Sequence, residues 1–202
     1  PPTRPPASVG ARRLVAATGG VRAGRPGAWG AAGGGGARGG PGSGLPPATG
    51  KSNDGKRMVW KAGSGLIIVL DVEGYAVRLL PGEKGDDLFR LSPDGARLGF
   101  VRANDLWVWD IASKASQRLT TDGSAVIKNG TLPLVYWEEI FGRQDNGYWW
   151  SPDSKTIAFL RSDESMVTEM TYLDFKPGVP RVIKQRYPKS GTTNPVVPDL
   201  GY

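Results

Sequence analysis

Two adjacent carboxylates, Glu138 and Glu139, are the side chains of this sequence best placed to bind a ligand. They follow Tyr136-Trp137 and precede Ile140-Phe141. Carboxylates usually stay in water, because removing them from water costs free energy unless a partner compensates. Two acids in such an apolar setting therefore indicate a site that holds a cation, and we take Glu138 and Glu139 as the candidate binding residues.

The sequence contains no histidine and no cysteine, which removes several common kinds of site. Ser-His-Asp and Cys-His nucleophiles cannot be built from these 202 residues, nor can zinc sites with His or Cys ligands. The motifs Ser-x-x-Lys and Gly-x-Ser-x-Gly do not occur either. We assign no catalytic residue, no cofactor and no metal site, and we expect these residues alone not to be catalytically competent.

The net charge of +7 is concentrated in residues 1–50. That segment carries six arginines and no acid, together with 15 of the 30 glycines and 8 of the 17 prolines. It can bury little apolar surface to offset its ordering entropy, so we predict a disordered, low-complexity tail. An RNA-contacting arm or an Arg-rich transit peptide is the functional alternative.

Residues 51–202 are nearly neutral, with 20 Lys and Arg against 19 Asp and Glu. A folded nucleic-acid-binding face is therefore not expected, and we predict no nucleic-acid partner. The longest apolar run covers only residues 66–70, far fewer than the roughly 18 residues that cross a bilayer. We predict no membrane-spanning segment in this chain.

A short pattern recurs three times, beginning at Ser52, Ser92 and Ser151. Each copy opens with a Ser-x-Asp turn and continues into a short apolar segment, and residues 67–71 and 106–110 resemble each other as a second strand. The 40-residue period between the first two copies is typical of β-propeller blades. We predict an all-β fold, a partial β-propeller of about three to four blades over residues 51–202.

The second interval, from Ser92 to Ser151, is 59 residues long and thus 19 residues longer than the first. The added segment, residues 124–147, contains Glu138 and Glu139, and insertions between blades often form a binding face. Adjacent side chains on a strand point to opposite faces, whereas on a helical turn they can converge. A shared ligand therefore requires a short helix or tight turn over residues 134–142.

Three further features allow a structural and a functional interpretation. Packing in the core is favoured over a stacking platform for Trp107, Trp109, Trp149 and Trp150. Asn129-Gly130-Thr131 fits both a hairpin turn and a glycosylation sequon. The acids Asp86 and Asp87 stand in a Gly-rich loop, where we expect them to be solvated.

Several motifs follow one another after residue 92. They are Ser92-Pro93-Asp94-Gly95, Asn129-Gly130, Glu138-Glu139-Ile140-Phe141-Gly142-Arg143, Trp149-Trp150-Ser151-Pro152-Asp153 and Tyr187-Pro188-Lys189-Ser190-Gly191. In this order they resemble the N-terminal β-propeller region of dipeptidyl peptidase IV-type serine peptidases, in the prolyl oligopeptidase clan. The Glu-Glu segment followed by Trp-Trp-Ser-Pro is the most specific part of the resemblance.

The resemblance implies that Glu138 and Glu139 bind the α-ammonium of peptide substrates with a free N-terminus. It further implies a substrate-binding fragment of a serine dipeptidyl peptidase, whose α/β-hydrolase domain is missing from these residues, and a homodimer. The sequence differs from the family pattern at two places. Pro133-Leu134 precedes Val135 where the family usually has a tryptophan, and Trp137 takes the place of a further acid. The arginine with which the family holds the substrate carbonyl has no identified counterpart.

A different class of function stays open, namely a non-catalytic propeller that serves as a protein-interaction scaffold. The acidic pair would then bind a basic group of a partner protein. In either case an incomplete propeller leaves unpaired strand edges, and we expect association or poor solubility when the chain is expressed alone.

Overall fold

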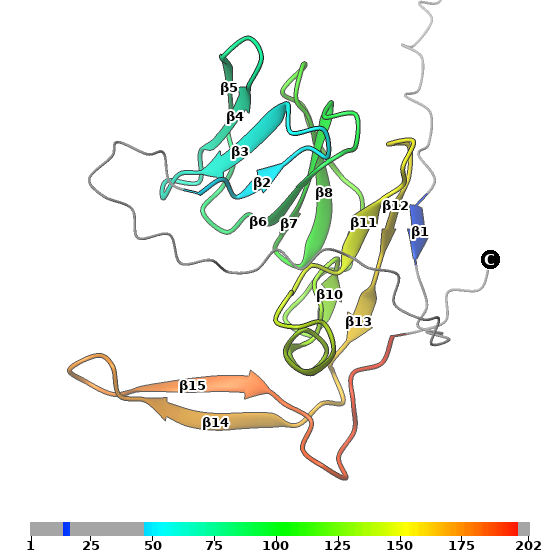
Figure 1. Ribbon diagram of the computed structural model, residues 1–202. Helices are drawn as coiled ribbons and strands as arrows, with labels where there is room; N and C mark the ends of the chain where they lie inside the picture. Colours follow the sequence, from blue (N-terminus) through cyan, green and yellow to red (C-terminus); the bar gives the residue numbers. More distant parts are fainter. Residues whose placement is uncertain (1–13, 17–46, 198–202) are drawn as a thin grey trace, which may run out of the picture.

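The computed structural model describes residues 14–16 and 47–197 (Figure 1). Apart from one helical turn, the regular elements of these residues are β-strands, which confirms the all-β prediction. The predicted disordered tail, residues 1–50, lies mostly outside the described residues. Within it the structure describes the backbone of β1 (Leu14–Ala16), which pairs in parallel with β12 (Ile157–Phe159), and residues 47–50.

Two four-stranded antiparallel sheets correspond to the first two sequence repeats. The first contains β2 (Gly50–Lys51), β3 (Arg57–Lys61), β4 (Ile67–Asp71) and β5 (Ala76–Leu80). The second contains β6 (Asp87–Leu91), β7 (Arg97–Arg102), β8 (Asp105–Asp110) and β9 (Ser116–Arg118). In each sheet consecutive strands are neighbours, as in a propeller blade, and the fold is a partial β-propeller.

The third repeat forms a shorter sheet. Its strand β11 (Tyr148–Trp150) pairs with β12, while β13 (Arg161–Asp163) pairs with β10 (Ile127–Asn129), which lies near the start of the added segment 124–147. A separate hairpin of β14 (Glu169–Asp174) and β15 (Arg181–Arg186) follows and projects from the rest of the structure (Figure 1).

The turn of each repeat is closed by its serine. Ser52 Oγ donates a hydrogen bond to Asp54 Oδ1 (2.6 Å) and accepts one from the backbone N–H of Arg57 (2.9 Å). The turns that begin at Ser92 and Ser151 have the same two bonds. These contacts are local in sequence, which explains why the repeat is visible before any tertiary structure is known.

Arginines connect each turn to the turn of the next sheet. The Arg57 guanidinium donates to the carbonyl of Gly95, and Arg97 Nη1 donates to the carbonyl of Ser154 at 2.9 Å. Ser154 also accepts a hydrogen bond from the backbone N–H of Asp94 (3.0 Å) through its Oγ. The three sheets are therefore fixed relative to one another at the end where the turns lie.

The turn aspartates predict how stability depends on pH. Hydrogen bonds from Ser52 and the backbone of Lys56 hold the pKa of Asp54 below its ordinary value, and Ser151 and the backbone of Lys155 do the same for Asp153. Because the folded-state pKa is lower than the unfolded-state pKa, this stabilisation is present above about pH 4 and is lost as the pH falls through the folded value. We expect the urea midpoint to drop between about pH 6 and about pH 3, and to drop less in a Ser151→Ala variant. An equal drop in both proteins would contradict this account.

Two apolar clusters form the core, one on each face of the second sheet. The first joins the first sheet to the second and contains Val59, Ile67, Val69, Leu80, Phe89, Leu91, Leu98, Phe100, Trp109 and Ile111. The second joins the second sheet to β11 and β12 and contains Val101, Leu106, Val108, Tyr148, Ile157 and Phe159. The second sheet is buried on both faces, as expected for a blade between two neighbours.

The predicted role of the tryptophans in the core is confirmed for three of them. Trp109 is buried, and Trp107 and Trp150 pack against the two clusters. The prediction of a core position is wrong for Trp149, which is 43% exposed. Successive side chains of a strand point to opposite faces, so Trp149 faces away from the cluster that contains Tyr148.

Asp86 is not solvated, contrary to the prediction for the Gly-rich loop. It is completely buried and forms a bidentate ion pair with Arg102, with Nε–Oδ1 and Nη2–Oδ2 distances of 2.6 Å. Its neighbour Asp87 is exposed, as predicted. The guanidinium of Arg102 in turn lies over the rings of Phe100 and Trp107, 5.2 and 5.1 Å from their centroids.

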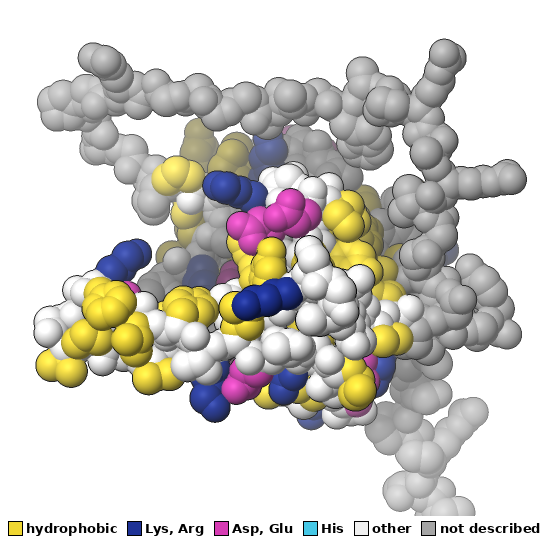
Figure 2. Space-filling model, turned by 90° about the horizontal axis from the view of Figure 1, so that it is seen from below, with side chains coloured by type: hydrophobic (Ala, Val, Ile, Leu, Met, Phe, Trp, Pro, Cys, Tyr) yellow, Lys and Arg dark blue, Asp and Glu magenta, His cyan; other side chains and the backbone are white. Residues whose placement is uncertain are grey.

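The β14–β15 hairpin leaves much apolar surface in water. Its exposed hydrophobic side chains and those of its connecting turn are Tyr172, Leu173, Phe175, Val179 and Val182. Figure 2 shows hydrophobic side chains gathered at this projecting end. No helix in the described part of the chain is long and apolar enough to span a bilayer.

Candidate functional site

The residues that carry Glu138 and Glu139 form a loop closed at its base. Thr131 and Asn146 pair as an antiparallel bridge, and the N–H of Gly147 donates to the carbonyl of Gly130 at 2.9 Å. A Cβ at position 147 would lie 3.1 Å from backbone carbons of Gly130 and Thr131, so a side chain there would require the neighbouring backbone to shift by a few tenths of an ångström, which glycine avoids. The loop therefore starts and ends at one fixed point beside β11.

Inside the loop the chain forms a π-helical turn, Tyr136–Ile140. The turn begins where the carbonyl of Pro133 accepts the N–H groups of Tyr136 (2.9 Å) and Trp137 (3.1 Å), and it ends where the N–H of Phe141 donates to the Tyr136 carbonyl (2.9 Å). The prediction of a short helix or tight turn is confirmed. Glu138 and Glu139 thus lie side by side on one turn instead of on opposite faces of a strand, and π-helical turns are frequent at functional sites.

The apolar shell predicted around the two acids is not formed by the described residues. Glu138 and Glu139 are exposed, Ile140 is 65% exposed and Phe141 is 38% exposed, and the turn contains no buried residue. The physical reason is that a single turn at the end of a loop can direct only part of its surface toward the body. Tyr136 and Trp137 are half-buried, while the following residues extend into solvent.

Glu138 and Glu139 nevertheless differ from most other acids of the structure. Nine described carboxylates form ion pairs with Lys or Arg, among them Asp86, Asp105 and Glu164. Neither Glu138 nor Glu139 has an ion pair or a side-chain hydrogen bond with any described residue. Both carboxylates are therefore available to a ligand.

The sequon at Asn129 is not displayed on the folded surface. Asn129 is fully buried, and its Nδ2 donates to Asp122 Oδ1 (2.8 Å) and Asp105 Oδ1 (3.3 Å). A glycan would have to replace one of these hydrogens and pass through the core. The buried amide instead ties β10, and with it the base of the loop, to the second sheet.

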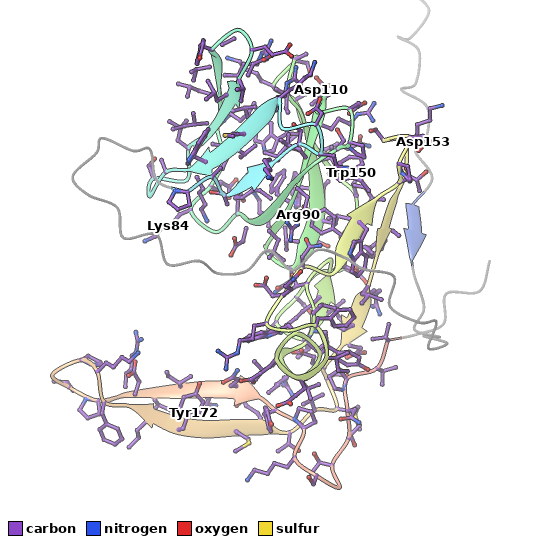
Figure 3. The ribbon with its side chains drawn as sticks, viewed as in Figure 1. Lys84, Arg90, Asp110, Trp150, Asp153 and Tyr172 are labelled. Carbon is purple, nitrogen blue, oxygen red and sulfur yellow. The ribbon has the colours of Figure 1, made fainter. Side chains whose placement is uncertain are left out.

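A cleft of about 430 Å³ lies between β6, β11 and the loop. We call it the Arg90 cleft after the one charged residue among the described residues that line it. Arg90 on β6 and Trp150 on β11 come from neighbouring sheets (Figure 3), and the Trp150 indole N–H donates to the Arg90 carbonyl at 3.1 Å. Phe141, which ends the π-helical turn, also lines the cleft.

Two residues of this cleft, Arg90 and Asn146, could not be identified from the sequence pattern. A basic residue on a short strand is ordinary, and Asn146-Gly147 resembles any turn. Their significance depends on the tertiary fold, which leaves the Arg90 guanidinium without a carboxylate among the described residues and buries Asn146 at the base of the loop. Within the described ranges, no group of three or more acids has a metal-binding arrangement.

The described strands form a partial β-propeller, and the loop between β10 and β11 presents Glu138 and Glu139 on a helical turn. Residues 52–199 match the family model of the dipeptidyl peptidase IV (DPP IV) N-terminal region. The match covers most of the chain, and the chain belongs to this family.

Two curated relatives and one solved structure illustrate the similarity. A probable dipeptidyl peptidase 4 of Aspergillus clavatus is 36% identical over 137 residues, which cover 64% of this chain and 17% of the relative. A probable dipeptidyl-aminopeptidase B of Talaromyces stipitatus is 41% identical over 118 residues, or 52% of this chain and 13% of the relative. The crystal structure of Porphyromonas gingivalis dipeptidyl peptidase 4 superposes with a TM-score of 0.60 and 30% identity, covering 73% of this chain and 22% of that one. The chain thus spans less than a quarter of the length of each.

Proposed function

We propose that this chain supplies peptide recognition to a dipeptidyl peptidase, and that Glu138 and Glu139 bind the α-ammonium group of the peptide. The observation that carries the proposal is the placement of both acids on one π-helical turn without a cationic partner among the described residues. Two carboxylates can accept two or three charge-assisted hydrogen bonds from one ammonium, and each is stronger than a neutral bond.

The exposure of the pair sets the strength of this interaction. An exposed ion pair contributes only about 0.2–1 kcal/mol and is weakened by salt. Binding to this chain should therefore be weak, and its contribution to proteolysis is positional. Holding the ammonium at a fixed distance from a nucleophile selects the peptide bond after the second residue, which is a matter of orientation and not of chemistry.

The proposal assigns the chemical step to groups outside these residues. The sequence holds no histidine, so a Ser-His-Asp triad would have to come from an α/β-hydrolase domain that acts with this region. A homodimer is the second partner that the family resemblance implies. The exposed apolar hairpin β14–β15 is a surface that could be buried in such an assembly.

The ammonium site is tested by comparing a peptide that has a free N-terminus with its N-acetylated form. We expect the free peptide to bind about tenfold more tightly, measured by NMR titration or by the fluorescence of the neighbouring Trp137. Glu138→Gln and Glu139→Gln should each weaken binding of the free peptide about two- to fivefold, and the double variant should remove the preference.

The matched control is Glu73→Gln, which changes an exposed glutamate of the first sheet that pairs with Lys56. It should leave peptide binding unchanged. If wild-type protein binds the acetylated peptide equally well, the ammonium site is refuted. Binding of a folded partner protein that depends on Glu138 and Glu139 would then favour the scaffold function.

A further inference from the structure

We propose that the Arg90 cleft binds the C-terminal carboxylate of a short peptide whose ammonium is held by Glu138 and Glu139. The inference rests on the proposed ammonium site and extends it to the other end of the ligand. Together the two sites would recognise small zwitterionic peptides of two to four residues, the class to which the released dipeptides of a dipeptidyl peptidase belong.

The first observation is the unpaired cation. Arg90 is exposed on β6 and has no ion pair or side-chain hydrogen bond with a described residue. Arg90 and the buried Tyr148 both line the cleft. A planar guanidinium can donate two parallel hydrogen bonds to a carboxylate, which makes it the side chain best matched to such a ligand.

The second observation is a buried acceptor without a donor. Asn146 is only 8% exposed; its Nδ2 donates to the Tyr148 carbonyl at 2.6 Å, but its Oδ1 has no hydrogen-bond partner. This oxygen is shielded from solvent, so a ligand N–H can reach it only after the Asn146 side chain turns toward the cleft, and such a bond would recover the free energy that an unpaired buried acceptor costs. A peptide bound along the cleft offers such an N–H one residue away from its carboxylate.

The third observation is the arrangement of charge. The only charge contributed by the described lining of the cleft is positive, while the adjoining π-helical turn carries two negative charges. Phe141 belongs to both, and it lies two residues from Glu139, hence no more than about 7.6 Å away between Cα atoms. An extended peptide advances roughly 3.3 Å per residue, so peptides of two, three and four residues sample increasing separations between the two sites.

The remaining lining suits a peptide better than a highly charged ligand. The rings of Phe141 and Trp150 offer apolar surface to a side chain, and the amide of Gln144 offers both a donor and an acceptor. A single cation among apolar and neutral polar groups fits one carboxylate. A nucleotide or polyphosphate would need several basic groups.

The test compares alanine peptides of two, three and four residues as free acids and as C-terminal amides, with the whole chain and NMR titration. We expect the free acid to bind about tenfold more tightly than the amide at one or more of these lengths. Arg90→Gln should remove this preference without changing the fold, because the Arg90 side chain has no ion pair with a described residue and is exposed. Arg78→Gln on the outer strand β5 is the matched control and should keep the preference.

The outcomes separate this inference from the proposed function. Equal binding of acid and amide at all three lengths, or a preference that survives in Arg90→Gln, overturns it even if N-acetylation weakens binding as expected. A preference for the acid that disappears in Arg90→Gln supports the carboxylate site. If N-acetylation then has no effect, the ammonium site at Glu138 and Glu139 fails alone.

Discussion

Replacement of Asp105 by alanine is expected to lower the free energy of unfolding by about 3 kcal/mol. Asp105 is buried at the start of β8, and its Oδ1 accepts hydrogen bonds from Thr120 Oγ1 (2.7 Å), the Gly123 N–H (3.0 Å) and Asn129 Nδ2 (3.3 Å). Its Oδ2 is paired with Arg118. Alanine would leave several of these donors unsatisfied in the core, and each unsatisfied buried group costs about 1–3 kcal/mol.

The measurement is urea unfolding at neutral pH, followed by tryptophan fluorescence. The control is Asp110→Ala at the opposite end of the same strand, since Asp110 accepts side-chain and backbone hydrogen bonds only from nearby Ser113 among the described side-chain contacts. We expect that variant to lose no more than about 1 kcal/mol. Similar losses in the two variants would show that the Asp105 network is not a major source of stability. If Asp105→Ala does not fold, Asp105→Asn, which keeps an acceptor oxygen, should fold with an intermediate loss.

The Asp105 network also connects stability to the candidate site. Asn129 joins Asp105 to Asp122, and Asp122 is paired with Arg161 of β13 at 2.7 Å. These contacts hold β10 and β13 together immediately before Gly130, where the loop with Glu138 and Glu139 begins. A weakened network should therefore loosen the base of the loop before the two main sheets separate.

The parts of this structure that could be predicted are those determined by neighbours in sequence. The Ser-x-Asp turns form through contacts over at most five residues, so their repetition indicated sheets of the right kind. The helical turn followed from the argument that two adjacent acids cannot share a ligand on a strand. The assignment of Glu138 and Glu139 to a peptide ammonium came from the family resemblance, because composition alone does not identify a ligand.

The parts that could not be predicted depend on which residues meet across the chain. Asp86 and Asp87 are identical in type and adjacent in sequence, yet only Asp86 meets Arg102, sixteen residues away. The exposure of Glu138 and Glu139 also depends on tertiary contacts that the sequence does not reveal. Apolar neighbours in sequence indicated a shell, but a single turn cannot direct all of its side chains toward the body.

Because Asp86 is buried and Asp87 is exposed, substitutions at the two positions should differ strongly in their effect on the free energy of unfolding. Asp86→Ala should lower the free energy of unfolding by about 3–5 kcal/mol, because it removes one partner of a buried ion pair. Arg102, whose side chain is only 16% exposed, would keep its charge because arginine stays protonated in proteins, and its remaining ion-pair partner would be the exposed Glu83 at 2.8 Å. The N–H of Glu83, which donates to Asp86 Oδ2 at 2.8 Å, would also lose its acceptor.

Asp87→Ala is the control at the adjacent position. Asp87 is exposed, and its carboxylate accepts only the N–H of Leu88 (2.9 Å) among the described contacts, so a change within about 0.5 kcal/mol is expected. The double variant Asp86→Ala/Arg102→Met separates the cost of the stranded charge from the loss of packing. If the charge is the cause, removing both partners should restore part of the stability lost in Asp86→Ala, since replacement of a buried pair by apolar groups is often nearly neutral. A double variant less stable than Asp86→Ala would instead show that Arg102 stabilises the fold mainly through its contacts with Phe100 and Trp107.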